Sequence, residues 1–353
     1  MRIAINGFGR IGRAFFKIAF EEKDLEIVAI NDLGDLENLA YLLKHDTVYG
    51  TYQKDIQTML PNFERSEKKG SADRREAGSY KLIVDKKEII FLQGKDPAKL
   101  PWKDLKIDVV IEATGVFEDY NKAKAHILAG AKKVIITAPA KSEEGKEGKT
   151  VLLGINEDDF KKFEVISNGS CTTNAVSPVI YLLNERLGIK KAILNTVHAY
   201  TATQNLVDGP TKGKDYLRGR SAGQNIVPST TGAAIAVTKA IKDLENKFDG
   251  LAIRVPVVCG SIADITFVSQ RETTPGEINE ILRKASQEDK WENILSVSEE
   301  PLVSSDIIKD FRPAVVDLTF TKVVDKDLVK VLVWYDNEWG YSWTLVEQLK
   351  RLK

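Results

Sequence analysis

Short apolar runs alternate with helix-like segments through the first part of the chain. The runs span residues 2–5, 25–30, 107–111 and 134–136. Between them, residues 14–21 and 121–128 repeat apolar side chains at the spacing of a helix that packs on one face. This alternation predicts an α/β structure, a doubly wound parallel sheet whose ligands bind beyond the carboxyl ends of the strands.

The second part of the chain has a different pattern. Its strand-like runs follow one another with few helices between them, at residues 192–197, 251–258, 263–269, 315–323 and 328–335. They predict a largely antiparallel sheet and therefore an α+β domain. A helix is predicted over residues 277–286, because Thr274 and Glu277 form a capping box with Pro275 at the first helical position.

Two segments interrupt these patterns. Residues 53–80 are polar and dense in charge, which predicts a solvated insertion or an extended hairpin, with docking of a partner as a second interpretation. Residues 198–229 form a long irregular stretch, and loops of that length within a domain usually carry function.

Length and charge narrow the class of protein. A chain of 353 residues is expected to form about two domains. Lys plus Arg equal Asp plus Glu at 51 each, so we expect neither nucleic acid nor a membrane as a partner. The chain opens on a strand-like run without a charged leader or an apolar signal core, and no apolar run reaches the length of a membrane span. A cytoplasmic location is therefore expected.

Three glycines form the pattern G-x-G-x-x-G between the first apolar run and the first helix. Gly7 permits a tight turn, Gly9 lets a pyrophosphate approach the backbone, and Gly12 allows the helix to pack closely on the strand. Asp32, 20 residues after Gly12, ends the second apolar run, where it can accept hydrogen bonds from ribose hydroxyls and repel a 2′-phosphate. The sequence therefore predicts a Rossmann-type domain that prefers NAD to NADP.

The two cysteines of the chain are Cys171 and Cys259. They are 88 positions apart and form neither a metal-spaced cluster nor a disulfide framework, so no metal site is expected and a reducing compartment is predicted. Cys259 lies in a strand-like run and is interpreted as a buried structural residue.

Cys171 lies where an irregular segment becomes the helix-like segment 176–187. Near a helix N-terminus, free N–H groups and the helix dipole lower the pKa of a thiol and make its thiolate available. The polar neighbours Ser170 and Thr172 favour this interpretation over the alternative, a small buried apolar residue. Cys171 is therefore predicted to be a nucleophile.

A histidine is the natural base for such a cysteine. His198 ends a strand-like run and begins the long loop, whereas His45 and His126 lie in helix-like stretches and are interpreted as structural or solvated. Sequence separation alone leaves open whether His198 and Cys171 meet.

Seven segments, in order along the chain, closely resemble phosphorylating glyceraldehyde-3-phosphate dehydrogenases. They are residues 6–13 (NGFGRIGR), 170–174 (SCTTN), 198–201 (HAYT), 208–210 (DGP), 231–234 (TGAA), 254–256 (RVP) and 334–341 (WYDNEWGY). The resemblance covers nearly the whole chain except roughly residues 53–80. Ordered motifs of this number are highly specific for the family.

The resemblance implies a reaction and a role for each matching residue. Cys171 would attack the aldehyde of D-glyceraldehyde 3-phosphate, while His198 takes the proton and steadies the oxyanion together with the backbone N–H of Cys171. Hydride transfer to NAD would leave a thioester, which inorganic phosphate cleaves to give 1,3-bisphosphoglycerate, a step of glycolysis and gluconeogenesis. The substrate phosphate is expected at Thr201, Arg220 and Arg254, and the attacking phosphate at Ser170, Thr172, Thr231 and Gly232. Cofactor contacts are expected at Gly7, Gly9, Arg10, Ile11, Gly12, Asp32, Lys95, Thr137 and Asn337.

The resemblance also implies an NAD-binding domain of residues 1–169 with 337–353, a catalytic domain of residues 170–336, and a homotetramer. Two alternatives stay open. An erythrose-4-phosphate dehydrogenase would oxidise a longer aldehyde to the free acid by hydrolysis on the same scaffold. A nucleotide-binding interaction protein would have lost catalysis, which the presence of Cys171 and His198 argues against.

Three departures from the family pattern are visible. Ala175 stands where the family often has a second, non-catalytic cysteine, so the chemistry is expected to be unaffected. Ile235 replaces a common lysine, which predicts a different surface or interface contact. Residues 257–260 (VVCG) replace a more usual Thr-Pro-Asn-Val, which puts the packing beside Arg254 in question.

Overall fold

The computed structural model describes residues 1–60, 80–211 and 215–352. Its contacts divide the chain into two units, Met1–Thr137 and Ala138–Lys353. Residues 138–169 and 337–353 fall in the second unit, whereas the sequence-based prediction assigns them to the NAD-binding domain. That assignment concerns binding rather than the density of contacts, and it stays a prediction.

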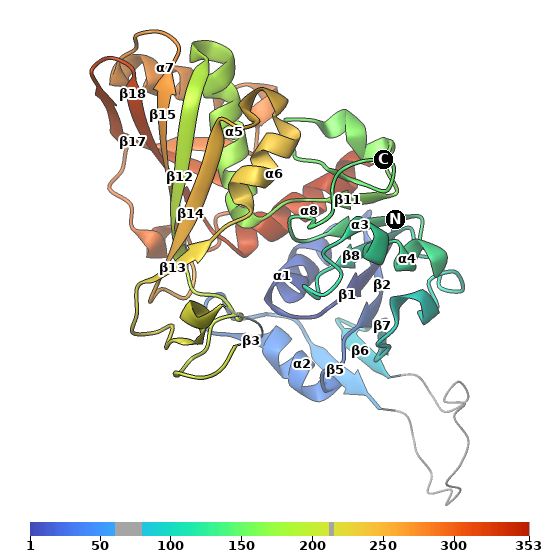
Figure 1. Ribbon diagram of the computed structural model, residues 1–353. Coiled ribbons are helices and arrows are strands. Elements are labelled where there is room, and N and C mark those ends of the chain that lie inside the picture. The colour runs from blue at the N-terminus through green and yellow to red at the C-terminus, as the bar shows by residue number, and fades with distance from the viewer. Residues whose placement is uncertain (61–79, 212–214, 353) are drawn as a thin grey trace, which may run out of the picture. The chain divides into compact units, whose positions relative to one another are not determined.

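The first unit is built on a parallel sheet (Figure 1). Its order is β9 (Lys133–Ile136), β8 (Val109–Glu112), β1 (Arg2–Asn6), β2 (Glu26–Asn31) and β7 (Lys87–Leu92). All neighbours in this series pair in parallel. The α-helices described in this unit are α1 (Arg10–Ala19), α2 (Leu36–Lys44), α3 (Tyr120–Ala123) and α4 (Ala125–Leu128). The predicted α/β class is confirmed for this unit.

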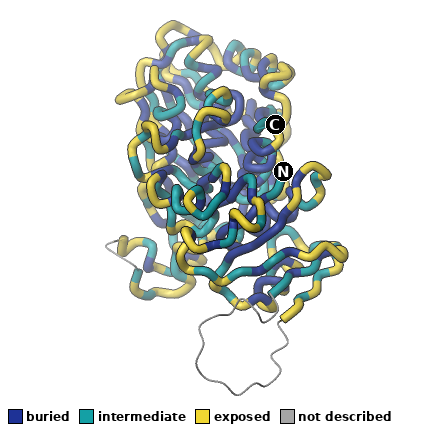
Figure 2. The backbone as a smooth tube through the Cα atoms, turned by 90° about the vertical axis from the view of Figure 1, so that its right-hand side faces the viewer, coloured by how far each residue is buried: buried dark blue, intermediate teal, exposed yellow. Residues whose placement is uncertain are grey.

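The central strands are apolar because both faces of a parallel sheet are covered. Ile3 of β1 and Val110 of β8 are fully buried, and Figure 2 shows the interior of the chain in the colour of buried residues with exposed segments outside it. The carboxyl ends of β1, β2 and β8 instead carry the polar residues Asn6, Asn31 and Glu112. These polar side chains therefore lie together at the carboxyl edge of the sheet.

Two antiparallel strands extend this sheet beyond β7. β6 (Lys81–Val84) pairs with β7, and β5 (Ile56–Met59) pairs with β6. The short strands β3 (His45–Asp46) and β4 (Gly50–Thr51) form a separate pair. The predicted insertion at residues 53–80 thus includes β5, while its residues 61–79 lie outside the described residues, and its role stays a prediction.

The second unit is built on a seven-stranded sheet. Its order is β13 (Val227–Thr230), β14 (Phe248–Val255), β12 (Ile189–Ala199), β15 (Ser261–Ser269), β18 (Leu328–Tyr335), β17 (Ala314–Val324) and β16 (Leu295–Ser298). The pairs are antiparallel except β12 with β14 and β16 with β17. β10 (Lys149–Thr150) and β11 (Val165–Ser167) pair in parallel. The predicted α+β class with a largely antiparallel sheet is confirmed.

Helices cover this sheet. α5 (Cys171–Leu187) packs between α6 (Ala233–Ala240) and α7 (Pro275–Ala285) and against β15, β17 and β18, while α8 (Trp339–Arg351) packs on α5. Along β15, buried residues alternate with half-buried ones, as expected for a strand with one face against helices. The helix α5 is buried along most of its length and is therefore held in a fixed position over the sheet.

A capping box sets the start of α5. The Ser170 hydroxyl accepts a hydrogen bond from the Thr173 backbone N–H at 3.1 Å, and the Ser170 N–H donates to the Thr173 hydroxyl at 3.1 Å. Cys171 is consequently the first residue of the helix. The predicted helix start at this cysteine is confirmed.

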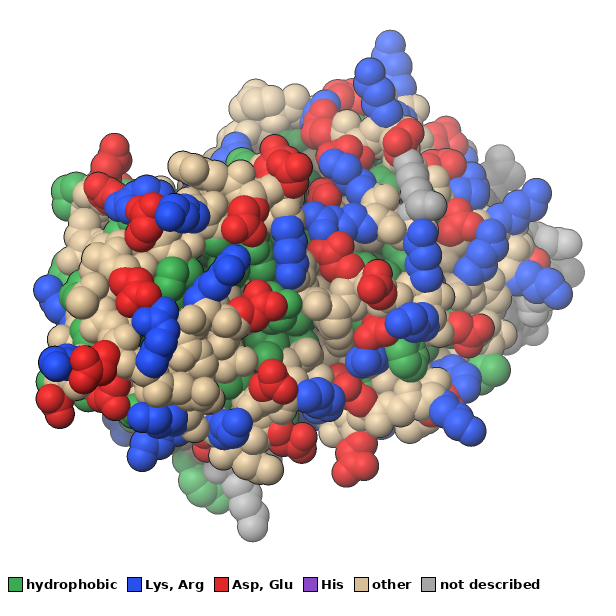
Figure 3. Space-filling view, turned by 90° about the horizontal axis from the view of Figure 1, so that it is seen from above, with side chains coloured by type: hydrophobic (Ala, Val, Ile, Leu, Met, Phe, Trp, Pro, Cys, Tyr) green, Lys and Arg blue, Asp and Glu red, His purple; other side chains and the backbone are tan. Residues whose placement is uncertain are grey.

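Surface charge is mixed in sign. On the face shown in Figure 3, Lys and Arg side chains are interspersed with Asp and Glu side chains. Over the described part of the chain, no helix combines the length and the apolar character needed to cross a membrane.

Candidate functional site

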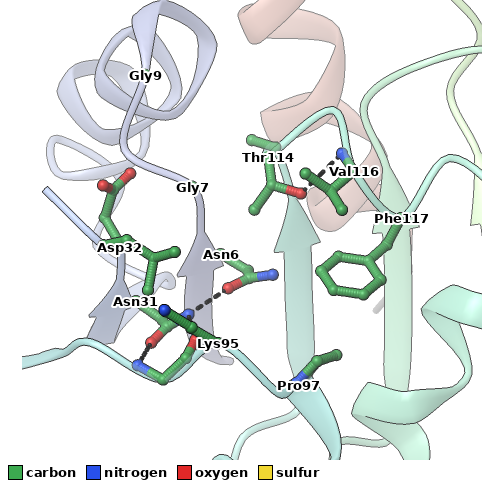
Figure 4. A pocket seen from close by; sticks show the side chains of 13 residues that line it. Asn6, Gly7, Gly9, Asn31, Asp32, Lys95, Pro97, Thr114, Val116 and Phe117 are labelled. Carbon is green, nitrogen blue, oxygen red and sulfur yellow. Dashed lines mark hydrogen bonds between the residues drawn. The ribbon is translucent and has the colours of Figure 1, made fainter.

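A pocket of about 360 Å³ opens at the carboxyl ends of β1, β2 and β8 in the first unit (Figure 4). It is lined by Asn6, Gly7, Gly9, Asn31, Asp32, Leu33, Gly94, Lys95, Pro97, Ala113, Thr114, Val116 and Phe117. Four of the predicted cofactor residues, Gly7, Gly9, Asp32 and Lys95, are among these. Arg10, Ile11, Gly12 and Thr137 belong to the same unit without lining the pocket, and Asn337 belongs to the second unit.

The three glycines are each required by the backbone. Gly7 has φ +94°, and a Cβ there would approach the backbone of Ala113 to 2.6 Å. A Cβ at Gly12 would lie 2.1 Å from the carbonyl oxygen of Gly7, so only glycine lets α1 pack this closely. Gly9 faces open space, because none of the described residues has an atom within 4 Å of the position of a Cβ there. A phosphate group therefore has free access to the backbone at Gly9.

The start of α1 suits an anion. Gly9 is the N-cap residue of this helix, no side chain caps it, and its first turn contains no acidic residue. Beside it, Asp32 accepts hydrogen bonds from the N–H groups of Phe8 at 2.6 Å and Gly34 at 2.8 Å. Each carboxylate oxygen keeps a second lone pair for a hydroxyl donor. The residues of this pocket therefore fit a dinucleotide with a free ribose 2′-hydroxyl.

The floor of the pocket is a chain of hydrogen bonds that the sequence interpretation missed. Asn31 donates to the Asn6 side-chain oxygen at 2.7 Å, and Asn6 donates to Glu112 at 2.5 Å. His126 contacts the same Glu112 oxygen at 3.0 Å and receives the indole N–H of Trp102 at 2.9 Å. Since the indole only donates, Nδ1 of His126 accepts and its proton lies on Nε2. Asn6 and Asn31 end apolar strands, which is the signal that could have identified them.

The second unit brings the predicted nucleophile and base together. Cys171 Sγ lies 3.4 Å from His198 Nε2. The cysteine is half-buried at the start of α5, and the buried histidine lies near the end of β12. The ring of Tyr335 on β18 packs edge-on against the imidazole, with ring centroids 5.9 Å apart. The imidazole thus contacts both the Cys171 sulfur and the ring of Tyr335.

The electrostatics of this pair differ from the local prediction. Burial raises the pKa of the Cys171 thiol, although the charge of Arg254 and hydrogen bonds from Thr172 act in the opposite direction. Burial and the neighbouring Arg254 lower the pKa of His198 from its ordinary value of 6.5 to about 3. The helix start alone therefore does not lower the pKa of the thiol in this structure.

Arg254 on β14 is the cation of this site. Its Nη1 lies 2.6 Å from Nδ1 of His198 and donates to the Ala199 carbonyl oxygen at 3.0 Å. β14 pairs with β12 in register, so that Arg254 stands directly opposite His198. The sheet pairing therefore fixes the arginine beside the base.

Thr172, a predicted phosphate ligand, is buried and bonded to the protein. Its hydroxyl lies 2.8 Å from the hydroxyl of Tyr335, which lies 2.7 Å from that of Thr196. Burial raises the pKa of Tyr335 well above its ordinary value, so the phenol stays protonated. Tyr335 thus links the helix that carries Cys171 to the strand that carries His198, a role that the sequence interpretation did not assign.

Two arginines of the long loop bind different partners. Arg220, a predicted ligand of the substrate phosphate, is exposed and pairs with Asp208 at 3.0 Å, and its place beside Thr201 and Arg254 stays a prediction. Arg218 instead donates to the hydroxyls of Thr203 and Ser229, both at 3.1 Å, and Thr203 contacts the Thr201 hydroxyl at 3.0 Å. The charge of Arg218 also acts on Arg254. Alternate arginines in a loop point in different directions, which spacing alone cannot resolve.

The other predicted residues lie at helix starts or beside them. Ser170 caps α5, while Thr231 accepts the N–H of Ala233 at 3.2 Å and Gly232 is the N-cap residue of α6. α5 and α6 pack together in the second unit. Cys259 is buried, as predicted.

Comparisons with known proteins agree with this geometry. The model of the glyceraldehyde 3-phosphate dehydrogenase NAD-binding domain matches residues 1–120, and that of the C-terminal domain of the same family matches residues 170–337. The chain belongs to the glyceraldehyde-3-phosphate dehydrogenase family. The predicted family, the fold class, the enzyme class and the NAD cofactor are confirmed, and the protein is an NAD-dependent oxidoreductase.

Relatives of this family match the chain over its full length. It is 42% identical to glyceraldehyde-3-phosphate dehydrogenase 2 of Bacillus subtilis, over 100% of this chain and 96% of the relative. It is 46% identical to the glyceraldehyde-3-phosphate dehydrogenase of Thermotoga maritima, over 99% and 98%. The corresponding protein of Borreliella burgdorferi is 43% identical, over 100% and 99%.

Replacing Asp32 tests the nucleotide pocket. In Asp32→Ala, the Kd for NAD is expected to rise about 10- to 100-fold, because hydrogen bonds to a charged acceptor are lost. The preference for NAD over NADP should fall, because the repulsion of a 2′-phosphate is removed. Titration of NAD and NADP by fluorescence or calorimetry measures both. Asp35→Asn keeps the cap of α2 and is the matched control; an unchanged preference in Asp32→Ala would contradict the assignment.

The lowered pKa of His198 predicts a pH dependence of stability. In the unfolded chain, His198 binds a proton near pH 6.5, whereas in the folded protein it does so only near pH 3. The folded protein therefore loses stability as the pH falls from 6.5 towards 3. Between about pH 6 and about pH 5, the free energy of unfolding of the wild type should fall about 1 kcal/mol more than that of His198→Asn. Urea unfolding at both pH values measures this, and equal losses would show that His198 is not held neutral.

Proposed function

We propose that this protein catalyses the phosphorylating oxidation of D-glyceraldehyde 3-phosphate to 1,3-bisphosphoglycerate, with NAD and inorganic phosphate. The observation that carries the proposal is the 3.4 Å contact between Cys171 Sγ and His198 Nε2, with Arg254 on the other side of the imidazole. This family member thus has a nucleophile in Cys171, a base in His198 and a cation for phosphate in Arg254.

The residues of the second unit account for the chemical steps. The Cys171 sulfur attacks the aldehyde carbon and its proton goes to His198 Nε2, which returns it to the developing oxyanion beside the Cys171 N–H. His198 then takes the hydroxyl proton of this hemithioacetal as the carbon loses hydride and a thioester forms. Bound NAD would supply the hydride acceptor. Oxygen of inorganic phosphate then attacks the thioester carbonyl, the carbon–sulfur bond breaks, and the acyl phosphate leaves with Cys171 restored. Cys171, the nucleophile in these steps, begins α5, and His198, the base, lies near the end of β12.

Two phosphate sites follow from these steps. We assign the substrate phosphate to Arg254 and Thr201 with Arg218 in place of Arg220, because Arg218 reaches the hydroxyls around Thr201. The attacking phosphate is assigned to Ser170, Thr172, Thr231 and Gly232, which lie at the starts of the packed helices α5 and α6. In the first unit, Gly7, Gly9 and Asp32 would hold the dinucleotide.

A homotetramer in the cytoplasm is part of the same proposal. Family membership supports it, and so do the exposed apolar side chains of the long loop, Leu206, Val207, Tyr216 and Ile226. The proposal also retains residues 1–169 with 337–353 as the NAD-binding domain and residues 170–336 as the catalytic domain.

The requirement for inorganic phosphate tests the function against its nearest alternative. Without phosphate, the purified protein with NAD and glyceraldehyde 3-phosphate should form about one NADH per Cys171 and then stop, because the thioester is not cleaved. Phosphate should restore steady turnover, and Cys171→Ser should abolish the initial burst. NADH absorbance measures both phases. Steady turnover without phosphate, together with a higher kcat/KM for erythrose 4-phosphate, would support hydrolysis of a longer aldehyde, and absence of any turnover would support the non-catalytic alternative.

The two arginines of the loop give a sharper test of the substrate site. In Arg218→Gln, the KM for glyceraldehyde 3-phosphate is expected to rise about 10- to 100-fold, because a charged donor to the phosphate region is lost. Arg220→Gln removes only an exposed pair with Asp208 and should have a much smaller effect. Steady-state kinetics at saturating NAD and phosphate compare them, and the reverse order would return the site to Arg220.

A further inference from the structure

Glu112 ends β8 beneath the nucleotide pocket, and donors surround its buried carboxylate. Oε1 accepts from the N–H of Thr114 at 2.9 Å and from the hydroxyl of the same residue. Oε2 accepts from Asn6 Nδ2 at 2.5 Å and from Nε2 of His126 at 3.0 Å. The His126 ring donates here because its Nδ1 accepts the indole N–H of Trp102. Both oxygens of the carboxylate therefore act only as acceptors.

This carboxylate sets the direction of two amide groups. A side-chain amide has a donor side and an acceptor side, so its partners decide which way it faces. With Nδ2 directed to Glu112, the side-chain oxygen of Asn6 faces Asn31 and accepts from it at 2.7 Å. Asn31 also donates to the Gly94 carbonyl oxygen at 3.0 Å and accepts the Gly94 N–H at 2.8 Å (Figure 4). Reversing either amide would bring two donors or two acceptors together.

The chain of hydrogen bonds ends on two walls of the pocket. Gly94 and its neighbour Lys95 line one wall. Thr114 and Val116 line another, where the Thr114 hydroxyl accepts the N–H of Val116 at 3.1 Å. Figure 4 shows Lys95 and Thr114 on different sides of Asn6. Each wall is therefore bonded to the amides that form the floor between them.

Glu112 lies behind this floor. It is not among the described residues that line the pocket, and neither are His126 and Trp102, although all three are buried next to it. Its partners Asn6 and Thr114 do line the pocket. The hydrogen bonds of Glu112 therefore reach a bound nucleotide through these two residues.

We propose that Glu112 is a positioning residue for the cofactor: its carboxylate fixes the Asn6 and Asn31 amides and, through its bonds, both walls of the pocket before NAD binds. A pocket that is ordered in advance binds its ligand more tightly, because binding does not have to order the side chains. The inference concerns the first unit alone. The chemistry proposed for the second unit is not needed for it.

Glu112→Gln tests the role of the carboxylate in the full-length protein. Whichever way it turns, the new amide directs its nitrogen at donors, either those of Thr114 or those of Asn6 and His126. The Asn6 amide then loses the acceptor that fixes its direction. The Kd for NAD should rise about 10- to 100-fold. Titration of NAD by fluorescence or calorimetry measures this without relying on turnover.

A double variant shows whether the direction of the hydrogen bonds matters. Asn6→Asp alone would place two carboxylates face to face, so the Kd for NAD should rise as in Glu112→Gln. In Asn6→Asp/Glu112→Gln, the carboxylate at position 6 accepts from Asn31 and from the amide at position 112. Its second oxygen replaces Asn6 Nδ2, which lies 3.4 Å from Nε2 of His126. The double variant should bind NAD about tenfold more tightly than either single variant.

Urea unfolding of each variant separates positioning from a purely structural role, which would lower the unfolding midpoint and leave the Kd of the folded protein unchanged. Glu88→Gln removes an exposed carboxylate paired with Lys81 in the same unit and should bind NAD as the wild type does.

Three outcomes would overturn the proposal. They are an unchanged Kd in folded Glu112→Gln, single effects on the Kd that multiply in the double variant, and a double variant that does not fold. If Glu112→Gln itself does not fold, recovery of folding and of NAD binding in the double variant supports the proposal.

Discussion

The contact between Cys171 Sγ and His198 Nε2 depends on the packing of one helix on one sheet. The histidine is near the end of β12, in the middle of a seven-stranded sheet, and the cysteine is the first residue of α5. α5 is buried along most of its length between α6 and α7, so packing fixes its position over the sheet. Tyr335 ties the two elements together through the hydroxyls of Thr172 and Thr196. A reactive pair from distant parts of the sequence is thereby held at 3.4 Å.

The same burial that fixes the pair opposes the charged form of each partner. A helix start and a nearby arginine favour a thiolate, but removing the sulfur from water opposes the charge, and the second effect is the larger one. For His198, burial and Arg254 act in the same direction, against the charged form.

The sequence was informative wherever the backbone or a local pattern decides the outcome. The parallel and antiparallel sheets, the glycines at the first turn, the helix start at Cys171 and the burial of Cys259 all follow from patterns within a few residues. What it could not supply was the direction of side chains in irregular segments. Arg218 and Arg220 are two positions apart in the loop, and only the three-dimensional course of η3 (Tyr216–Gly219) directs the first towards Thr203 and the second towards Asp208.

Long-range polar partners were equally beyond prediction. The sequence analysis assigned no role to Glu112, which ends β8, and it interpreted His126 as structural or solvated. In the structure, the two side chains meet in a buried chain of hydrogen bonds below the nucleotide pocket. A buried carboxylate needs such partners, because an unsatisfied charge in the interior costs several kcal/mol. Which residues provide them depends on how β8 and α4 are placed in the folded unit, and sequence spacing does not encode that.

The altered segment 257–260 shows how a departure from the family pattern is accommodated. Gly260 has φ +88°, and a Cβ there would lie 2.3 Å from the carbonyl oxygen of Ser304, so the valine more usual at this position does not fit this backbone. The turn that glycine permits directs its N–H to the side-chain oxygen of Asn337 at 3.1 Å, and Ser261 donates to the same oxygen at 2.9 Å. Cys259 donates to Asp336, the neighbour of Asn337. The turn at Gly260 and the hydroxyl of Ser261 therefore both hold the side-chain oxygen of Asn337.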